Sequence, residues 1–111
     1  LAQLKPLTWE RKVRDAIEEQ LPEGEPSAEH IAKALHLSLR SLQRHLADEG
    51  YRFDTLLNES RENLALLHLR DPQVSLSEIS YLLGFADTSS FSRAFKRWTG
   101  MTPGQFRDGL R

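Results

Sequence analysis

The chain of 111 residues contains no cysteine and no long apolar run. The lack of cysteine excludes disulfides, thiolate metal sites and a cysteine nucleophile, and it fits a reducing compartment. No apolar run approaches the roughly 20 residues of a membrane-spanning helix, and no signal peptide is visible, so we expect a cytoplasmic protein without a membrane partner. Because the chain starts at Leu1 instead of Met, we expect it to be a piece of a longer protein.

A net excess of positive charge is also missing, because the formal net charge is −1 at pH 7. Domains that bind nucleic acids are usually basic, so the overall charge argues mildly against such a partner. The charges are nevertheless segregated along the chain. Residues 1–37 carry five basic and seven acidic residues, whereas residues 88–111 carry one acidic residue and five basic ones: Arg93, Lys96, Arg97, Arg107 and Arg111. The face that these charges occupy therefore matters more than their sum.

The apolar pattern predicts an all-α fold, because no segment alternates like a strand and apolar residues recur at helical spacing. Caps, prolines and glycines divide this pattern into about seven helices. We expect two helix-turn-helix lobes joined by a long linker helix. The expected units are an N-terminal helix with a linker to an upstream domain (1–26), a first helix-turn-helix (27–52), the linker helix (53–72), and a second helix-turn-helix with a closing helix (73–111).

Individual helix ends and buried faces are also predicted. A helix capped by Thr8 is expected to end before Pro22, and later helices are expected over 28–35, 39–49, 53–69, 76–83, a segment after Ala86 or Asp87, and a short segment opened by Thr102 and Pro103. Residues at helical spacing are expected to point to the core: Leu39, Leu42, Leu46, Leu56, Leu57, Leu64, Ala65, Leu67, Phe91, Phe95, Trp98 and Phe106.

The two short helix pairs look like copies of each other. A shift of 48 residues superposes Ser27 on Ser75 and Ile31 on Ile79, and after the turn a shift of 49 superposes Leu42 on Phe91. The second turn therefore has one additional residue. Each copy has the form helix, tight turn, helix, and the second helix of such a unit normally enters the major groove of DNA.

The polar stripe of the first candidate recognition helix is suited to reading bases. With the leucines turned inward, Arg40, Gln43 and Arg44 share the opposite face. Arginine can bond both acceptors of a guanine edge, and glutamine can pair with adenine. An ordinary solvated face is the alternative interpretation of the same stripe.

The second candidate recognition helix offers shorter side chains. The shift of 49 residues carries the first stripe onto Ser89, Ser92, Arg93 and Lys96, and Arg93 is the strongest single candidate for a base contact. Hydroxyls at 88–90 and backbone N–H groups at helix starts can also hold phosphates, which position the protein without specifying sequence. The expected phosphate contacts are Ser27, Ser38, Ser75, Ser90, Lys96 and Arg97, although capping or plain solvation would explain the same residues.

These residues resemble the DNA-binding domain of AraC/XylS-type bacterial transcription regulators. The resemblance covers about residues 27–107, and its most distinctive part is the stretch 79–97, ISYLLGFADTSSFSRAFKR. It implies seven helices in two lobes, binding to double-stranded promoter DNA, and an N-terminal effector or dimerisation domain upstream of Leu1. It also implies base contacts at Arg40, Gln43, Arg44, Thr88, Ser89, Ser92 and Arg93.

Two departures from the family pattern carry expectations of their own. The first turn has His36 where the family often has glycine, so a positive φ there would be tolerated at some cost. The short hydroxyls of the second unit predict weaker base specificity than in the first unit. Separately, Arg61 in the middle of the linker helix is expected to bridge to a carboxylate between the lobes.

Two other classes of function compete with DNA binding. The four histidines form no metal-binding spacing and no glycine-rich phosphate loop is present, so we expect no enzyme, no metal and no cofactor. A helical protein-interaction module without DNA binding is the stronger alternative, because the acidic first helix could dock the upstream domain or RNA polymerase.

Overall fold

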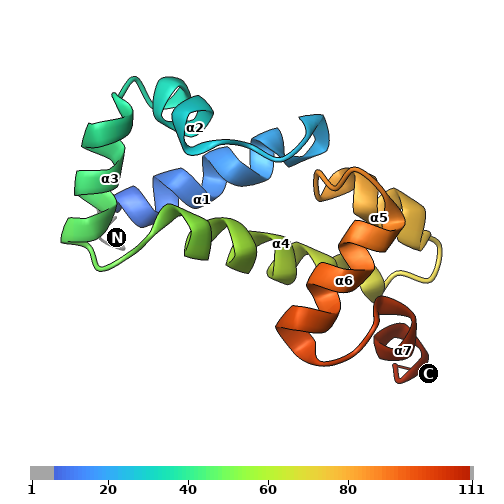
Figure 1. The fold of residues 1–111 in the computed structure, drawn as a ribbon. Helices are drawn as coiled ribbons and strands as arrows, with labels where there is room; N and C mark the ends of the chain where they lie inside the picture. The colour runs from blue at the N-terminus through green and yellow to red at the C-terminus, as the bar shows by residue number, and fades with distance from the viewer. Residues whose placement is uncertain (1–6, 111) are drawn as a thin grey trace, which may run out of the picture.

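The computed structural model describes residues 7–110, and within that range it contains helices and turns but no strand. The α-helices are α1 (Trp9–Gln20), α2 (Ala28–Ala34), α3 (Leu39–Asp48), α4 (Phe53–Leu69), α5 (Leu76–Leu82), α6 (Thr88–Thr99) and α7 (Pro103–Asp108). A short 3₁₀-helix, η1 (Leu21–Glu23), continues α1. Figure 1 shows two helix-turn-helix lobes joined by the long α4, which confirms the predicted fold class.

Side-chain caps start most of these helices at the predicted residues. The hydroxyls of Thr8, Ser27, Ser38, Ser75 and Thr102 each accept a hydrogen bond from the backbone N–H three residues later. Such a bond satisfies one of the N–H groups that the first helical turn leaves unpaired. At α6 the cap is Asp87, the second of the two predicted alternatives, and its carboxylate accepts from Ser90 N at 2.7 Å.

The core consists of two clusters, one in each lobe. The first cluster is formed by residues of α1, η1, α2, α3 and the first half of α4: Val13, Ala16, Ile17, Leu21, Ile31, Ala32, Leu42, Leu46, Leu56 and Leu57. The second cluster joins the end of α4 to α5 and α6: Ala65, Leu69, Ile79, Leu83, Phe91 and Phe95. The partly buried Leu64 packs against both clusters, so α4 belongs to both lobes.

Two of the predicted core positions are wrong. Leu67 is 58% exposed, because it lies nearly opposite Ala65 on the helix, and Ala65 is fully buried. Leu39 is only partly buried and belongs to neither cluster, because it is the first residue of α3 and lies beyond the edge of the packed region.

Two long-range contacts hold the ends of helices in place. The carboxylate of Glu49, at the end of α3, accepts from Trp9 N at 2.8 Å and from Glu10 N at 2.9 Å, so it caps the start of α1. The Trp9 and His45 rings stack beside this contact with centroids 4.2 Å apart. In the second lobe, the guanidinium of Arg107 donates to the carbonyls at the end of α4, including Leu69 O at 3.1 Å. Both contacts satisfy backbone groups that a helix end leaves free.

Candidate DNA interface

The two helix pairs match in the bounds of their first helices and in the start of their second helices, although α6 extends two residues further than α3. A shift of 48 residues carries α2 onto α5 from the first residue to the last, and it carries the cap Ser27 onto the cap Ser75. A shift of 49 residues carries Ser38 and the start of α3 onto Asp87 and the start of α6. The repeat predicted from the sequence is therefore a repeat of structure.

The two turns also have the same geometry. The residue after the helix C-cap has a left-handed backbone in both, with φ of 60° at His36 and 78° at Gly84. A backbone bond that spans five residues closes each turn, from Leu37 N to Ala32 O at 2.8 Å and from Phe85 N to Ser80 O at 3.0 Å. A positive φ at His36, which the sequence left conditional, is present, and His36 is the single non-glycine residue with this backbone among residues 7–110. A left-handed backbone costs an L-residue about 1–2 kcal/mol.

The predicted reading stripe of α3 is exposed. Arg40, Gln43 and Arg44 all lie on the surface, while Leu42 and Leu46 between them are fully buried in the first cluster. Neither arginine has a hydrogen bond or an ion pair among residues 7–110. The two guanidinium groups are therefore available to an external partner.

On α6 the predicted residues form a smaller and more constrained surface. Ser89 and Arg93 are exposed, whereas Thr88 and Ser92 are partly buried. Arg93 Nη2 lies 3.4 Å from Ser90 Oγ. The hydrogen bonds from Ser90, together with the charge of Arg93, hold the pKa of Asp87 below its ordinary value. Arg93 therefore lies close to a carboxylate that remains ionised at neutral pH.

The predicted phosphate contacts comprise three helix caps, one serine in the first turn of α6 and two free cations. Ser27, Ser38 and Ser75 already accept bonds from their own helices, and Ser90 contacts Arg93. Lys96 and Arg97 are exposed in the last turns of α6 and have no partner within the described range. Arg52 is a further candidate that the sequence did not indicate. It is exposed before α4 and lines a hollow of about 280 Å³ beside Gln43 and Ala47.

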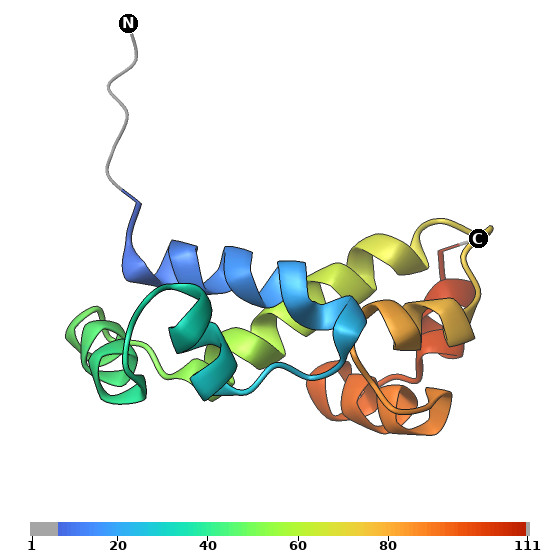
Figure 2. The same cartoon turned by 90° about the horizontal axis from the view of Figure 1, so that it is seen from above.

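The two candidate recognition helices lie on the same side of the molecule. In Figure 1, α3 and α6 lie one in each lobe, with α3 at the left and α6 at the lower right. Seen from above in Figure 2, α3 (green) and α6 (orange) lie along the lower edge, whereas the start of α1 (blue) and the end of α4 (yellow) lie toward the upper edge. The described residues extend 41 × 38 × 22 Å, and the two larger dimensions are comparable with one turn of duplex DNA, about 34 Å.

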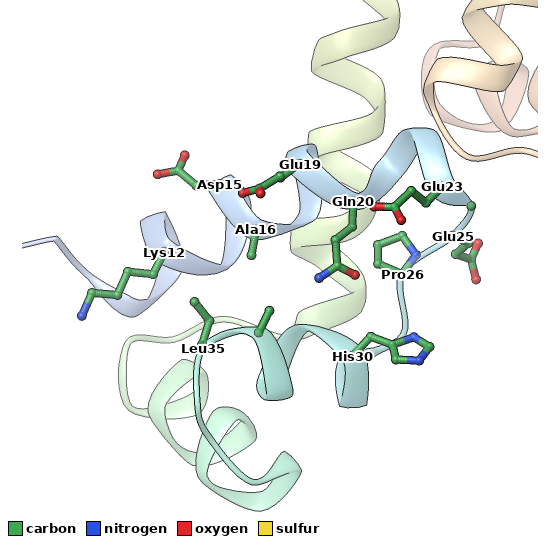
Figure 3. A pocket seen from close by; sticks show the side chains of 12 residues that line it. Lys12, Asp15, Ala16, Glu19, Gln20, Glu23, Glu25, Pro26, His30 and Leu35 are labelled. Carbon is green, nitrogen blue, oxygen red and sulfur yellow. The ribbon is translucent and has the colours of Figure 1, made fainter.

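A second surface feature is an open groove of about 810 Å³ between α1 and α2. Figure 3 shows carboxylates at its rim from α1, η1 and the following loop: Asp15, Glu19, Glu23 and Glu25. Lys12 and His30 are the basic residues that line it. The carboxylates of this rim repel phosphate groups, so the groove is not suited to the DNA backbone.

Between the lobes, Arg61 of α4 lies at a buried junction. Its side chain is 5% exposed and forms an ion pair with Glu25 at 2.8 Å, which confirms the predicted bridge between the lobes. It also donates from Nε to Leu83 O at 2.9 Å and from Nη2 to Gly84 O at 3.1 Å, two bonds that the sequence did not predict. Burial lowers the pKa of Arg61, and the bond to Glu25 partly opposes that shift.

Comparison with known proteins agrees with this geometry. A family profile described as a helix-turn-helix domain matches residues 31–109, which is most of the chain and includes both candidate recognition helices. The chain belongs to the AraC/XylS-type family of DNA-binding domains. It is therefore a DNA-binding domain of a bacterial transcription regulator, and this family is not a class of enzymes.

Relatives of this AraC/XylS-type domain are much longer proteins. The ornithine utilization regulator of Pseudomonas aeruginosa is 46% identical over 83 residues, which are 75% of this chain and 24% of that protein. The transcriptional regulator VirS of Mycobacterium tuberculosis is 45% identical over 87 residues, which are 78% of this chain and 26% of that protein. The chain thus spans about a quarter of the length of these curated relatives.

A solved structure supports the fold of the AraC/XylS-type domain over its full length. The crystal structure of a DNA-binding transcriptional dual regulator from Escherichia coli K-12 superposes with a TM-score of 0.85 at 25% identity, covering all of both chains. No helix within residues 7–110 is both long and apolar enough to cross a membrane.

Proposed function

We propose that this domain reads double-stranded promoter DNA by placing α3 and α6 in two successive major grooves on one face of the duplex. The observation that carries the proposal is the position of the cations without protein partners. Arg40 and Arg44 on α3 and Lys96 and Arg97 on α6 are exposed on equivalent helices of one side. Arginines that support the fold, such as Arg61, are bonded within the protein.

Base reading is assigned to the exposed stripes of the two helices. In the first unit the readers are Arg40, Gln43 and Arg44, whose long side chains can form bidentate bonds to base edges. In the second unit they are Thr88, Ser89, Ser92 and Arg93. Because three of these four are short, we expect α6 to contribute less base specificity than α3.

Phosphate contacts are assigned to two kinds of group. Backbone N–H groups at the starts of helices can bind phosphate oxygens, with Ser27, Ser38 and Ser75 as caps of such starts and Ser90 in the first turn of α6. Lys96 and Arg97 supply positive charge, and Arg52 joins them because it is exposed beside Gln43. These contacts orient the domain without specifying sequence.

The rest of the proposal concerns the longer protein. We infer that an N-terminal effector or dimerisation domain precedes this domain and that RNA polymerase is a further partner. Because such a protein acts on bacterial promoters, we place it in the cytoplasm and assign it no catalytic activity. The relatives support this extension by their length, since about three quarters of each lies outside the matched region.

A titration tests the DNA-binding part directly. The 111-residue chain is mixed with a random duplex at about 50 mM and then about 200 mM salt. Neutralised phosphates release counterions, so we expect the affinity to fall at least about tenfold between these salts. A duplex selected from a random pool should then bind more tightly than the random duplex. No binding, or a flat response to salt, would favour the protein-interaction module.

A further inference from the structure

The junction between the lobes is built around one arginine. Arg61 is buried, and its guanidinium contacts two other segments of the chain at once. One branch pairs with Glu25 in the loop before α2, and the others bind the carbonyls of Leu83 and Gly84 at the turn of the second unit. The Phe85 ring lies against the guanidinium, with its centre 4.1 Å from Arg61 Cζ.

The backbone of the second turn is also in direct contact with the first lobe. A Cβ added at Gly84 would lie 2.7 Å from Leu21 O and 2.8–2.9 Å from the backbone of Gly24. These distances are shorter than van der Waals contact, so a glycine is required there by close approach as well as by its φ of 78°. The turn between α5 and α6 is thus packed directly on the end of the first lobe.

We propose that Arg61 is a positioning residue that sets the separation of α3 and α6, and therefore the spacing of the two DNA segments that this domain accepts. The inference rests on the proposed reading of two grooves. The turn at Gly84 leads into α6 after three residues, so its contacts with Arg61 fix where α6 starts relative to the first lobe. A rigid connection makes binding by one unit favour binding by the other only when the spacing of the DNA segments matches.

The test measures spacing preference, which a merely structural role would not change. A duplex with two half-sites is selected from a random pool with the wild-type chain, and versions with one base pair added or removed between the half-sites are then prepared. For the wild type we expect each change to lower the affinity about tenfold or more. A wild-type chain that binds all three duplexes equally, or that selects one half-site alone, would overturn the two-groove function itself and the inference with it.

Two variants then test the junction. Arg61→Lys keeps the positive charge but loses the fork that reaches three partners, and Gly84→Ala forces the two backbones apart. We call the loss of affinity caused by adding or removing one base pair the spacing penalty. For both variants we expect this penalty to fall below about threefold, while the affinity for each isolated half-site stays within about twofold of wild type. An unchanged spacing penalty in these variants would overturn the inference and leave the proposed function intact.

The matched control is Arg14→Ala. Arg14 is also a paired arginine, but its partners Glu10 and Glu59 lie within the first lobe. The Arg14→Ala variant should keep the wild-type spacing penalty. If Arg61→Lys loses helix content, Glu25→Ala takes its place, because the Glu25 side chain is 63% exposed and its removal breaks the contact that ties Arg61 to the loop before α2. A smaller penalty in Glu25→Ala supports the inference, and an unchanged one contradicts it.

Discussion

The first and second helix-turn-helix units share a backbone but differ in what surrounds their turns. At the first turn, His36 is exposed in a left-handed conformation. At the matching second turn, Gly84 packs against the backbone of the first lobe and its carbonyl accepts a bond from Arg61. One turn is therefore open to solvent and the other is part of the junction between the lobes.

The recognition helices of the two units differ in the length of the side chains that they expose. The helix with the open turn, α3, presents Arg40, Gln43 and Arg44, whereas the helix with the packed turn, α6, presents small hydroxyls and Arg93. Long side chains can reach base edges from a range of positions, but short ones require a close and fixed approach. The comparison indicates a division of roles, in which the first unit supplies most of the base specificity and the second is held at a set distance.

The largest effect is expected at the matching turn residues. Gly84→Ala should lower the free energy of unfolding by about 3 kcal/mol or more, because it adds left-handed strain and a clash with backbone atoms. His36→Gly should instead raise it by about 0.5 kcal/mol, because relief of strain exceeds the added freedom of the unfolded chain. Urea unfolding of both variants measures the difference. A loss at Gly84→Ala no larger in magnitude than the gain at His36→Gly would show that the junction does not distinguish the two turns.

The next largest effects are expected for substitutions of the base-reading residues in the two units. Arg44→Ala should relax the preference at one base position by about 1–3 kcal/mol, measured on duplexes selected by the wild type and changed one base pair at a time. Arg93→Ala should act at a position in the other half-site by less than Arg44→Ala, because Asp87 lies beside Arg93. If Arg44→Ala weakens every duplex alike, its assignment to the major groove is wrong.

Loss of a proposed phosphate contact should have a different effect from loss of a base contact. Lys96→Ala should weaken binding to all duplexes by a similar factor and reduce the slope of affinity against salt by about one unit. Arg11→Ala is the control, because Arg11 pairs with Asp15 on α1 and lies outside the proposed interface. A change of base preference in Lys96→Ala would contradict its role as a phosphate contact.

The smallest effect concerns the caps of the two reading helices. The folded-state pKa of Asp87 is lowered, so its contribution to stability is fully present above the unfolded value of about 4 and is lost as pH falls through the folded value. Ser38, the matching cap of α3, does not titrate in this range. Asp87→Ser should therefore flatten the fall in stability on acidification, measured by urea unfolding below about pH 5. An unchanged pH profile would contradict the assignment.

Local features of the fold could be predicted from the sequence because they depend on neighbouring residues. The caps at Ser27, Ser38 and Ser75 follow from residue types within one turn of helix. Leu67 was misplaced because the linker helix is rich in leucine, so its apolar residues do not mark one face. Its burial is decided by which residues the two lobes cover.

Contacts between residues far apart in the sequence could be predicted less well. The ion pair of Arg61 was predicted from its place in the middle of the linker helix, but its bonds to Leu83 O and Gly84 O involve carbonyls with no sequence signature. The capping of α1 by Glu49 joins residues 39 and 40 positions apart, beyond any local pattern. Among the candidate site residues, the stripes on α3 and α6 were predictable from periodicity, whereas the exposure of Arg52 beside Gln43 required the fold.

A hydroxyl-radical footprint of the wild-type chain on its selected duplex tests the central claim most directly. Two recognition helices on one side of the molecule predict two protected segments on the same face of the duplex, centred about 10 base pairs apart. A single protected segment, or two segments on opposite faces, would contradict the account.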